Sequence, residues 1–387
     1  MEETQAHPPR VPVLLVTGFL GSGKTTLVNR LLKTQAFSRA AVVVNEYGEV
    51  SIDHVLVQAP RWRMRVIDSG CLCGHVHEEV ASSLLDLNDK RRRRPDLDYD
   101  FVLVEMSGLA DPVPVIQILT TDPHMTELYE LRTVITVADG VHGAGHLDQH
   151  GESIKQAAVA DTIVISKTDV ADAATIDALA ARLAAINPGA RQFRVAQGGI
   201  EPAQILAQAG FGVAARSDAA QGWLNDTSYA ANVAPASADA TISTFSLSHD
   251  AEITIPGFVL WMNLLAGFRG AGLLRVKGIV NVEGKPYAVQ AVQTILSNPV
   301  ELDAWPDHER RSRLVFITRG IDPEDIKRTF ATFSFEGGRA ARNMTINPAT
   351  YERFRNTIQL FRTSPQPISP KPSTPAVAGQ TRDLELQ

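Results

Sequence analysis

Residues 18–25 of the chain read Gly18-Phe19-Leu20-Gly21-Ser22-Gly23-Lys24-Thr25, and the apolar run 11–16 comes just before them. A strand, a glycine-rich turn and then a helix is the context in which the pattern G-x-x-x-x-G-K-[ST] forms a phosphate-binding loop. Glycines let the backbone bend so that its N–H groups point at phosphate oxygens. We expect Lys24 to reach the β- and γ-phosphates and Thr25 to hold Mg²⁺. The predicted nucleotide-binding residues of this phosphate loop are Gly18, Gly21, Ser22, Gly23, Lys24, Thr25 and Thr26.

The composition is that of an ordinary globular chain with room for two domains and a tail. Its 387 residues are 44% hydrophobic and carry a formal net charge of −6, which argues against a general nucleic-acid binder. No apolar run approaches the roughly 20 residues that span a bilayer, and the polar start of the chain does not read as a signal peptide. The two cysteines lie too close together in the sequence for a disulfide between them to stabilise the fold. We expect a reduced, cytoplasmic setting, with neither nucleic acid nor membrane as a partner.

The first part of the chain alternates between apolar runs and helical patterns, which predicts an α/β fold with a mostly parallel sheet covered on both faces. The predicted strands are residues 11–16, 41–44, 64–67, 101–104, 134–137 and 162–165, and the predicted helices are 25–34, 76–87, 114–119, 152–159 and 173–186. After a flexible N-terminus over residues 1–10, this domain is expected to occupy residues 11–212.

The composition changes after the first domain. Residues 213–240 are rich in Ala, Ser, Asp and Asn and lack periodicity, which indicates a linker. A smaller α+β domain is predicted over residues 241–335, with strands over 241–247, 272–282, 286–292 and 313–318 and helices over 256–268 and 323–333. Residues 336–387 form a tail, and its proline-rich part from about residue 363 is expected to be disordered.

A carboxylate ends one of the predicted strands. The apolar run 101–104 leads into Glu105, and Gly108 follows shortly after. In a parallel sheet the carboxyl ends of the strands face the ligand crevice. We therefore expect Glu105 to orient a magnesium-bound water or the attacking water, and Gly108 to let the chain approach the γ-phosphate. With Lys24, these residues are the predicted catalytic group.

A second motif, Ser166-Lys167-Thr168-Asp169, follows another predicted strand. A strand that ends in [N/T/S]-K-x-D is the guanine-reading element of GTPases. Asp169 can accept hydrogen bonds from guanine N1–H and its 2-amino group together, a pair of donors that adenine lacks. Lys167 would pack its aliphatic stem along the base. Ser166 stands where Asn is usual, which indicates weaker guanine affinity. This pattern favours GTP over ATP.

The segment after the third predicted strand is rich in metal-binding side chains. Two thiols and two imidazoles lie within seven residues, at Cys71, Cys73, His75 and His77. Residues two apart in an extended chain project to the same side, so Cys71, Cys73 and His75 could converge on one ion such as Zn²⁺. The alternative is a pair of inert thiols beside solvated histidines.

Three histidines recur every four residues, at His142, His146 and His150. On a helix they would share one face. However, Gly143 and Gly145 fall between them, and each glycine weakens a helix by about 1 kcal/mol relative to Ala. We therefore expect a flexible loop with ordinary surface histidines.

Taken together, these motifs resemble those of the CobW-type GTPases, a metallochaperone group related to the nickel-delivery GTPases. The resemblance covers residues 11–335 and rests on the phosphate loop together with four further segments. These are the switch-like segment 45–53, the magnesium-side segment 105–112, the base-reading motif 166–169, and the segment 273–278 with Trp305 in the second domain. It implies a P-loop GTPase domain followed by a smaller C-terminal domain, with GTP and Mg²⁺ as ligands.

The chain departs from the family in its metal motif. The family signature is Cys-x-Cys-Cys, whereas this chain has Cys71-Leu72-Cys73-Gly74. Either His75 or His77 replaces the missing thiolate, or the site has weakened or changed its preference. A histidine ligand would still suit Zn²⁺ and would also admit Co²⁺ or Fe²⁺. Glu46 and Glu49 of the switch-like segment are further candidate ligands for the transition metal or for Mg²⁺.

The resulting hypothesis is a GTPase that couples the nucleotide state to binding a transition metal, Zn²⁺ before Co²⁺ or Fe²⁺, and to its delivery to a client metalloprotein. Two alternatives belong to other classes. A P-loop small-molecule kinase would share the phosphate loop but needs no guanine reader. A non-catalytic regulatory or scaffold protein would bind nucleotide without turnover. The sequence leaves the oligomeric state open.

Overall fold

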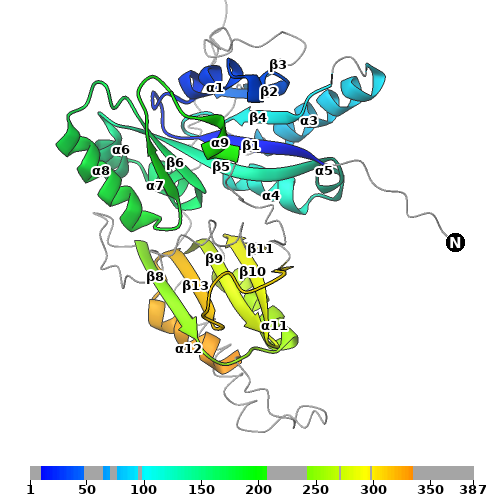
Figure 1. The fold of residues 1–387 in the computed structure, drawn as a ribbon, viewed down its shortest axis with the longest axis vertical. Coiled ribbons are helices and arrows are strands. Elements are labelled where there is room, and N and C mark those ends of the chain that lie inside the picture. Colours follow the sequence, from blue (N-terminus) through cyan, green and yellow to red (C-terminus); the bar gives the residue numbers. More distant parts are fainter. Residues whose placement is uncertain are drawn as a thin grey trace, which may run out of the picture.

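The computed structural model describes residues 10–47, 64–69, 76–94, 98–206, 242–269, 272–296 and 299–333. Two sheets lie one above the other in Figure 1, each with helices packed against it. The predicted linker 213–240 and tail 336–387 lie outside the described residues, so these two predictions are not tested.

The first sheet contains seven described strands in the order β3-β2-β4-β1-β5-β6-β7, and every neighbouring pair is parallel. The strands are β1 (Val11–Thr17), β2 (Ala40–Tyr47), β3 (Met64–Ser69), β4 (Phe101–Glu105), β5 (Tyr129–Asp139), β6 (Thr162–Ser166) and β7 (Arg191–Arg194). The predicted α/β class is therefore confirmed. The sequence analysis missed β7, because its residues, Arg191-Gln192-Phe193-Arg194, do not form an apolar run.

Helices cover both faces of this sheet. They are α1 (Lys24–Leu32), the 3₁₀ turn η1 (Gln35–Phe37), α3 (Val76–Arg93), α4 (Val113–Thr121), α5 (Pro123–Leu128), α6 (Gly143–Gln149), α7 (Gly151–Val159), α8 (Ala173–Ile186) and α9 (Pro202–Leu206). Neighbouring residues of β1 point to opposite faces. Leu15 packs in a core with α3 and α4, and Leu14 packs in a core with α1 and Phe37. This explains why the strands read as continuous apolar runs.

The second sheet is antiparallel and has the main order β11-β10-β9-β13-β8, with β12 paired to β10. Its strands are β8 (Ile242–His249), β9 (Leu273–Val282), β10 (Lys285–Val292), β11 (Ile295–Leu296), β12 (Val300–Glu301) and β13 (Ser312–Arg319), and its helices are α11 (Ile255–Arg269) and α12 (Pro323–Phe333). Glu283 and Gly284 turn the β9–β10 hairpin with φ angles of 52° and 87°, as two-residue hairpin turns require.

The two domains share a core. Leu274 and Ile317 of the second sheet are buried in one cluster with Ala157 and Ala158 of α7 and Leu183 of α8. The edge strand β8 also contacts α8, where the Thr244 hydroxyl donates to the Ile186 carbonyl over 2.9 Å. Shared apolar burial of this kind ties the domains together more firmly than polar surface contacts would.

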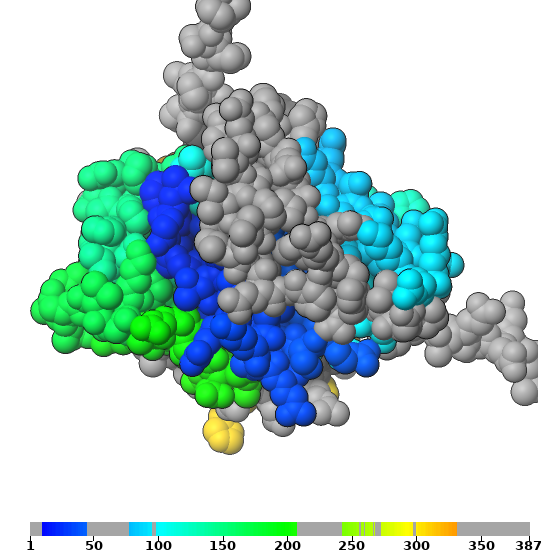
Figure 2. Space-filling view, turned by 90° about the horizontal axis from the view of Figure 1, so that it is seen from above, coloured from blue at the N-terminus to red at the C-terminus, as the bar shows by residue number. Residues whose placement is uncertain are grey.

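Figure 2 views the molecule from above, along the edge of the first sheet. Dark blue N-terminal residues lie between the cyan region, which contains α3, and the green segments, which run through α6 to α9. The N-terminal residues and the later helices of the first domain therefore share this face of the molecule.

Candidate nucleotide-binding site

The phosphate loop connects β1 to α1 through three glycines with positive φ. The φ angles are 137° at Gly18, 67° at Gly21 and 96° at Gly23. Residues other than glycine rarely adopt such angles. A Cβ on Gly18 would also lie 2.2 Å from the carbonyl oxygen of Val137 on β5. The loop therefore needs glycine at residue 18 for both its conformation and its space.

The ammonium group of Lys24 lies on the concave side of the phosphate loop. Lys24 is 8% exposed, and its Nζ donates to the carbonyls of Gly18 at 2.9 Å and Phe19 at 3.1 Å. Ser22 Oγ is buried and has no hydrogen-bond partner among the described residues. Because α1 begins at Lys24 without a side-chain cap, its first N–H groups also point at this curve. These donors together suit phosphate oxygens.

Thr25, predicted to hold Mg²⁺, and Glu105, predicted to orient water, lie in contact. Thr25 Oγ1 donates to Glu105 Oε1 at 2.6 Å. Glu105 is 2% exposed and ends β4, which pairs with β1 so that Val16 lies opposite Glu105. A hydroxyl and a carboxylate are hard oxygen ligands, which Mg²⁺ prefers. The structure thus brings together two residues separated by 80 positions in the sequence.

The loop after β4, residues 105–111, lies directly against the phosphate loop. A Cβ on Gly108 would fall 2.6 Å from the backbone nitrogen of Leu20. No side chain fits in that space without moving backbone. We call residues 105–111 the magnesium-side loop. Its close approach to residues 18–25 is the geometry expected of a loop that lies near a terminal phosphate.

The base-reading motif is tied to the phosphate loop through its first residue. Ser166 is buried, and its Oγ lies 2.6 Å from the carbonyl oxygen of Ser22 and 3.2 Å from that of Ala138. Ser166 therefore supplies a side-chain tether to the phosphate loop. Asp169 follows on an exposed turn, where its carboxylate is accessible to a ligand.

Lys167 of the same motif is held by a residue that the sequence analysis did not single out. Its Nζ lies 2.7 Å from Oδ2 of Asp139, which is 2% exposed at the end of β5. Burial alone would raise the pKa of Asp139, but hydrogen bonds from Lys167 and from the N–H groups of His142 and Val141 outweigh it and lower that pKa. Lys167 has a φ of 56°, so the ion pair helps to hold a conformation that is unfavourable for lysine.

The loop after β7 forms a further wall of the site. The Thr168 N–H donates to the Val195 carbonyl over 3.4 Å, and a Cβ on Gly198 would lie 3.0 Å from the Thr26 carbonyl of α1. Gln197 and Gly198 both have positive φ. The sequence analysis missed this loop, and its only signal was the pair Gly198-Gly199 after the short β7.

Of the three regularly spaced histidines, His146 lies on a helix and His142 and His150 flank its two ends, so the predicted flexible loop is wrong. α6 spans Gly143–Gln149, and neighbouring rings of His142, His146 and His150 are 6.3 Å apart. The ring of Phe19 from the phosphate loop packs against His146 at 4.7 Å and against His150 at 4.3 Å. Burial lowers the pKa of His146. Tertiary contacts here outweigh the low helix propensity of glycine.

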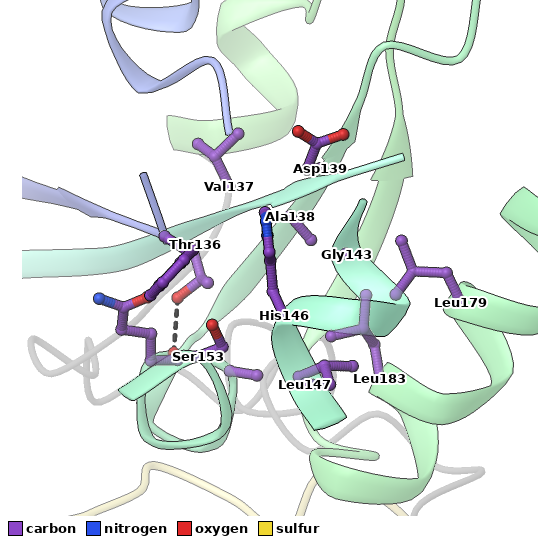
Figure 3. Close-up of a pocket in the computed structure, with 13 residues that line it drawn as sticks. Thr136, Val137, Ala138, Asp139, Gly143, His146, Leu147, Ser153, Leu179 and Leu183 are labelled. Carbon is purple, nitrogen blue, oxygen red and sulfur yellow. Dashed lines mark hydrogen bonds between the residues drawn. The ribbon is translucent and has the colours of Figure 1, made fainter. Parts of the chain in front are cut away.

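Phe19 of the phosphate loop lines a small pocket of about 20 Å³, and Figure 3 shows a close-up of this pocket. Asp139 and His146 lie on one side of it in the close-up, and Leu179 and Leu183 of α8 lie on another. The dashed line marks the bond from the Thr136 hydroxyl to the Gln156 carbonyl of α7. The pocket is too small for a nucleotide, but its walls support the phosphate loop from below.

The predicted transition-metal residues are only partly described. Glu49, Cys71, Cys73 and His75 lie outside the described residues. Glu46 lies on β2 opposite Asp68 of β3, and His77 is the second residue of α3 and is partly buried. Within the described residues, no group of three or more His, Cys, Asp or Glu side chains could hold a metal ion. The metal site therefore stays a prediction.

The parallel sheet, the phosphate loop at the end of β1 and the carboxylate at the end of β4 define a P-loop nucleotide-binding fold. Residues 12–194 match the family described as CobW/HypB/UreG, nucleotide-binding domain. Residues 242–334 match the family described as cobalamin synthesis protein cobW C-terminal domain. The chain belongs to the CobW family.

Two named relatives cover different shares of the chain. The zinc chaperone YjiA of Escherichia coli is 31% identical over 323 residues, which is 83% of this chain and 98% of YjiA. A zinc chaperone CobW of Pseudomonas aeruginosa is 32% identical over 51% of this chain and 59% of its own length. The crystal structure of Zn(II)-bound YjiA GTPase superposes with a TM-score of 0.64 at 26% identity, over 84% of this chain and 99% of that one.

Among the described residues, no helix combines the length and apolar character needed to cross a membrane.

Proposed function

We propose that the chain binds GTP with Mg²⁺, hydrolyses it, and uses the nucleotide state to control the binding and delivery of a transition metal to a client metalloprotein. One observation carries the nucleotide part of this proposal. The phosphate loop contacts the magnesium-side loop through Thr25 and Glu105, and it contacts the base-reading motif through Ser22 and Ser166. These contacts support the proposal because they join the segments predicted to bind phosphate, metal ion and base.

Each predicted residue has a chemical role in this proposal. Lys24 would leave the loop carbonyls and neutralise charge on the β- and γ-phosphates. Thr25 would hold Mg²⁺, whose charge would further neutralise the phosphate oxygens. Glu105 would orient water for attack, and Gly108 would allow its loop to lie against the γ-phosphate. Phosphoryl transfer to water needs positioning and charge stabilisation rather than a covalent intermediate.

The choice of base provides the sharpest test of this proposal. Asp169 would accept from guanine N1–H and from the 2-amino group. Xanthine has a carbonyl in place of that amino group, so Asp169→Asn can donate to the carbonyl and still accept from N1–H. We expect the variant to lose about 100-fold in GTP affinity and to bind XTP more tightly than GTP. Titration with fluorescent GTP and XTP analogues measures both changes.

The matched control is Asp177→Asn, which removes an exposed carboxylate from α8 that pairs with Arg194. It should leave both affinities unchanged. If the two variants behave alike, Asp169 does not read the base. If the wild type prefers ATP to GTP, the small-molecule kinase becomes the better assignment.

Hydrolysis is tested separately from binding. Thr25→Ala removes the hydroxyl that contacts Glu105, and we expect phosphate release to fall by 100-fold or more, about 2.7 kcal/mol in activation free energy. A wild-type protein that binds GTP without turnover would support the non-catalytic regulator instead.

The metal part of the proposal rests on the relatives, which are named zinc chaperones, and on the cluster of Cys71, Cys73, His75 and His77. Cobalt titration, followed by its thiolate absorption, should show tighter binding with a non-hydrolysable GTP analogue and Mg²⁺ than without them. Replacing Cys71 and Cys73 together with Ser should abolish the band. If the cobalt affinity is the same with and without the analogue, metal binding does not depend on the nucleotide state.

A further inference from the structure

Helix α7 (Gly151–Val159) contacts the magnesium-side loop and also the C-terminal domain. It packs on β5 of the first sheet and on β9 of the second. The side chains of Lys155 and Gln156 in its middle contact the magnesium-side loop, and the carbonyl of its last residue, Val159, contacts the C-terminal domain. Neither set of contacts is part of the nucleotide site described above.

Gln156 holds the magnesium-side loop on the side that faces away from the phosphate loop. Its side chain is 1% exposed, and Nε2 donates to the Gly108 carbonyl at 3.1 Å and to the Ala110 carbonyl at 3.3 Å. The neighbouring Lys155 reaches Asp111 Oδ2 at 3.3 Å. Both carbonyls bound by Gln156 belong to a loop whose other side touches Leu20 of the phosphate loop. The loop is therefore enclosed between the phosphate loop and α7.

The backbone of α7 is held on the sheet beside the same residue. Thr136 on β5 donates its hydroxyl to the Gln156 carbonyl at 2.6 Å (Figure 3). At the end of the helix, Asn187 Nδ2 lies within 3.0 Å of the carbonyls of Ala157, Ala158 and Ala160. These contacts occupy carbonyls that a helix end leaves without intrahelical partners. The helix can therefore move only with its neighbours or by breaking buried hydrogen bonds.

The last helical carbonyl is bound by the other domain. Arg275 of β9 donates to the Val159 carbonyl and also pairs with Oδ1 of Asp161. Arg275 is 3% exposed and Asp161 is 2% exposed, and the other carboxylate oxygen of Asp161 accepts from the Val134 N–H at 2.9 Å. A buried ion pair with these hydrogen bonds resists separation, because removing one partner leaves the other charge buried and unpaired.

We propose that α7 is a mechanical relay between the magnesium-side loop and the C-terminal domain, with Gln156 as the positioning residue at one end and Arg275 as the anchor at the other. When the loop carbonyls at Gly108 and Ala110 rearrange, Gln156 moves with them. Because Gln156 is part of α7, the movement strains the hydrogen bond between the Val159 carbonyl and Arg275. In the reverse direction, the position of β9 sets how firmly the loop is held. The nucleotide-dependent part of the relay rests on the proposed GTPase function.

The relay can be tested without nucleotide by hydrogen exchange in the full chain. In Arg275→Met the Val159 carbonyl loses its partner, Asp161 keeps the more distant Lys277 as a cation, and α7 loses its anchor. We expect the backbone amides of residues 105–111 to exchange about tenfold faster, although Arg275 touches none of them. Gln156→Met, which keeps the side-chain length and removes the donor, should raise exchange in the same segment by a similar factor.

Arg313→Met is the matched control. Arg313 is also a buried arginine of the second sheet, but it pairs with Asp307 and Glu309 inside its own domain. Its replacement should leave exchange at residues 105–111 within twofold of the wild type. Unchanged exchange of this segment in Arg275→Met would overturn the relay.

If Arg275→Met unfolds the C-terminal domain, Arg275→Lys decides the question. The lysine keeps the charge but cannot donate to Val159 and Asp161 in the same way. Faster exchange limited to α7 and residues 105–111 would support the relay, and wild-type exchange there would refute it. Because these measurements use nucleotide-free protein, a failure of the GTPase proposal would leave their outcome unchanged.

The relay also predicts how the same variants hydrolyse GTP. Gln156→Met and Arg275→Met should each lower kcat for GTP about tenfold while KM stays within twofold, because the base-reading motif is untouched. If the variants change hydrogen exchange but the wild type hydrolyses no GTP, the relay stands and the proposed function fails.

Discussion

At the scale of single residues, small contacts decide how the nucleotide motifs meet. Ser166 is the clearest case, because the sequence pattern led us to expect weaker guanine affinity from a serine at a position where asparagine is usual. The structure gives this serine a defined contact, a 2.6 Å approach to the Ser22 carbonyl of the phosphate loop. The tether between the base-reading motif and the phosphate loop therefore does not require an amide.

Ser166→Ala should weaken GTP binding without unfolding the chain. The substitution removes one buried hydrogen bond, which contributes about 1 kcal/mol, so we expect roughly fivefold weaker binding of a fluorescent GTP analogue. Ser38→Ala removes an exposed hydroxyl that bonds within the chain at the Gln35 carbonyl, and its affinity should match the wild type. Equal affinities for all three proteins would show that the contact with Ser22 does not position the base-reading motif.

At the scale of elements, local patterns predicted most of the first sheet. Its apolar strands and the phosphate loop are encoded in contiguous residues, so their existence follows from short-range rules. The C-terminal α+β domain was also predicted, and its hairpin turn lies at Glu283-Gly284 as expected. The contact between Thr25 and Glu105 followed from strand ends meeting at one edge.

What the sequence did not reveal depends on distant contacts. Asp139 and Gln156 belong to no motif, and their partners lie 28 and 48 residues away. Strand β7 has no apolar run, so only its pairing with β6 identifies it. Helix α6 was predicted to be a loop because propensity rules penalise its glycines. Packing against Phe19 and α8 supplies the missing stability.

The two glycines of α6 should respond in opposite ways to alanine. A Cβ at Gly145 would meet nothing within 4 Å, whereas a Cβ at Gly143 would lie 2.9 Å from the buried side chain of Leu179. Gly145→Ala should therefore raise the free energy of unfolding by about 0.5–1 kcal/mol through helix propensity. Gly143→Ala should lower it, because Leu179 must shift within a packed core. Urea denaturation of both variants measures the two changes in the free energy of unfolding. Equal changes would contradict the packing argument.

At the scale of the whole molecule, the two domains behave as one body because their interface combines apolar packing with buried charges. Leu274 and Ile317 extend the core of the first domain, while Asp161 lies between Arg275 and Lys277 of β9. Two cations therefore share one carboxylate at a largely buried interface. Burial of a charge is costly unless its neighbours compensate for it, so one of these cations is expected to give up its proton readily.

Lys277 is that cation. Burial lowers its pKa from 10.5 to about 7, the repulsion from Arg275 acts in the same direction, and Asp161 at 3.8 Å only partly opposes the shift. In the unfolded chain the lysine regains its ordinary pKa. Between about pH 7 and pH 10.5 the unfolded state therefore binds a proton that the folded state lacks. The free energy of unfolding must rise with pH across this window, because stability increases wherever the unfolded state binds more protons.

Lys277→Met should remove this pH dependence. In the wild type, Lys277 adds up to about 1.4 kcal/mol per pH unit to the free energy of unfolding between pH 7 and pH 9. The Met variant should be more stable than the wild type at pH 7, and the difference should shrink as the pH rises. Urea denaturation at pH 7, 8 and 9, followed by the fluorescence of the buried Trp261, measures both curves. Parallel curves would mean that Lys277 keeps its proton in the folded protein, so that Asp161 compensates both cations and the interface holds a complete charge triad.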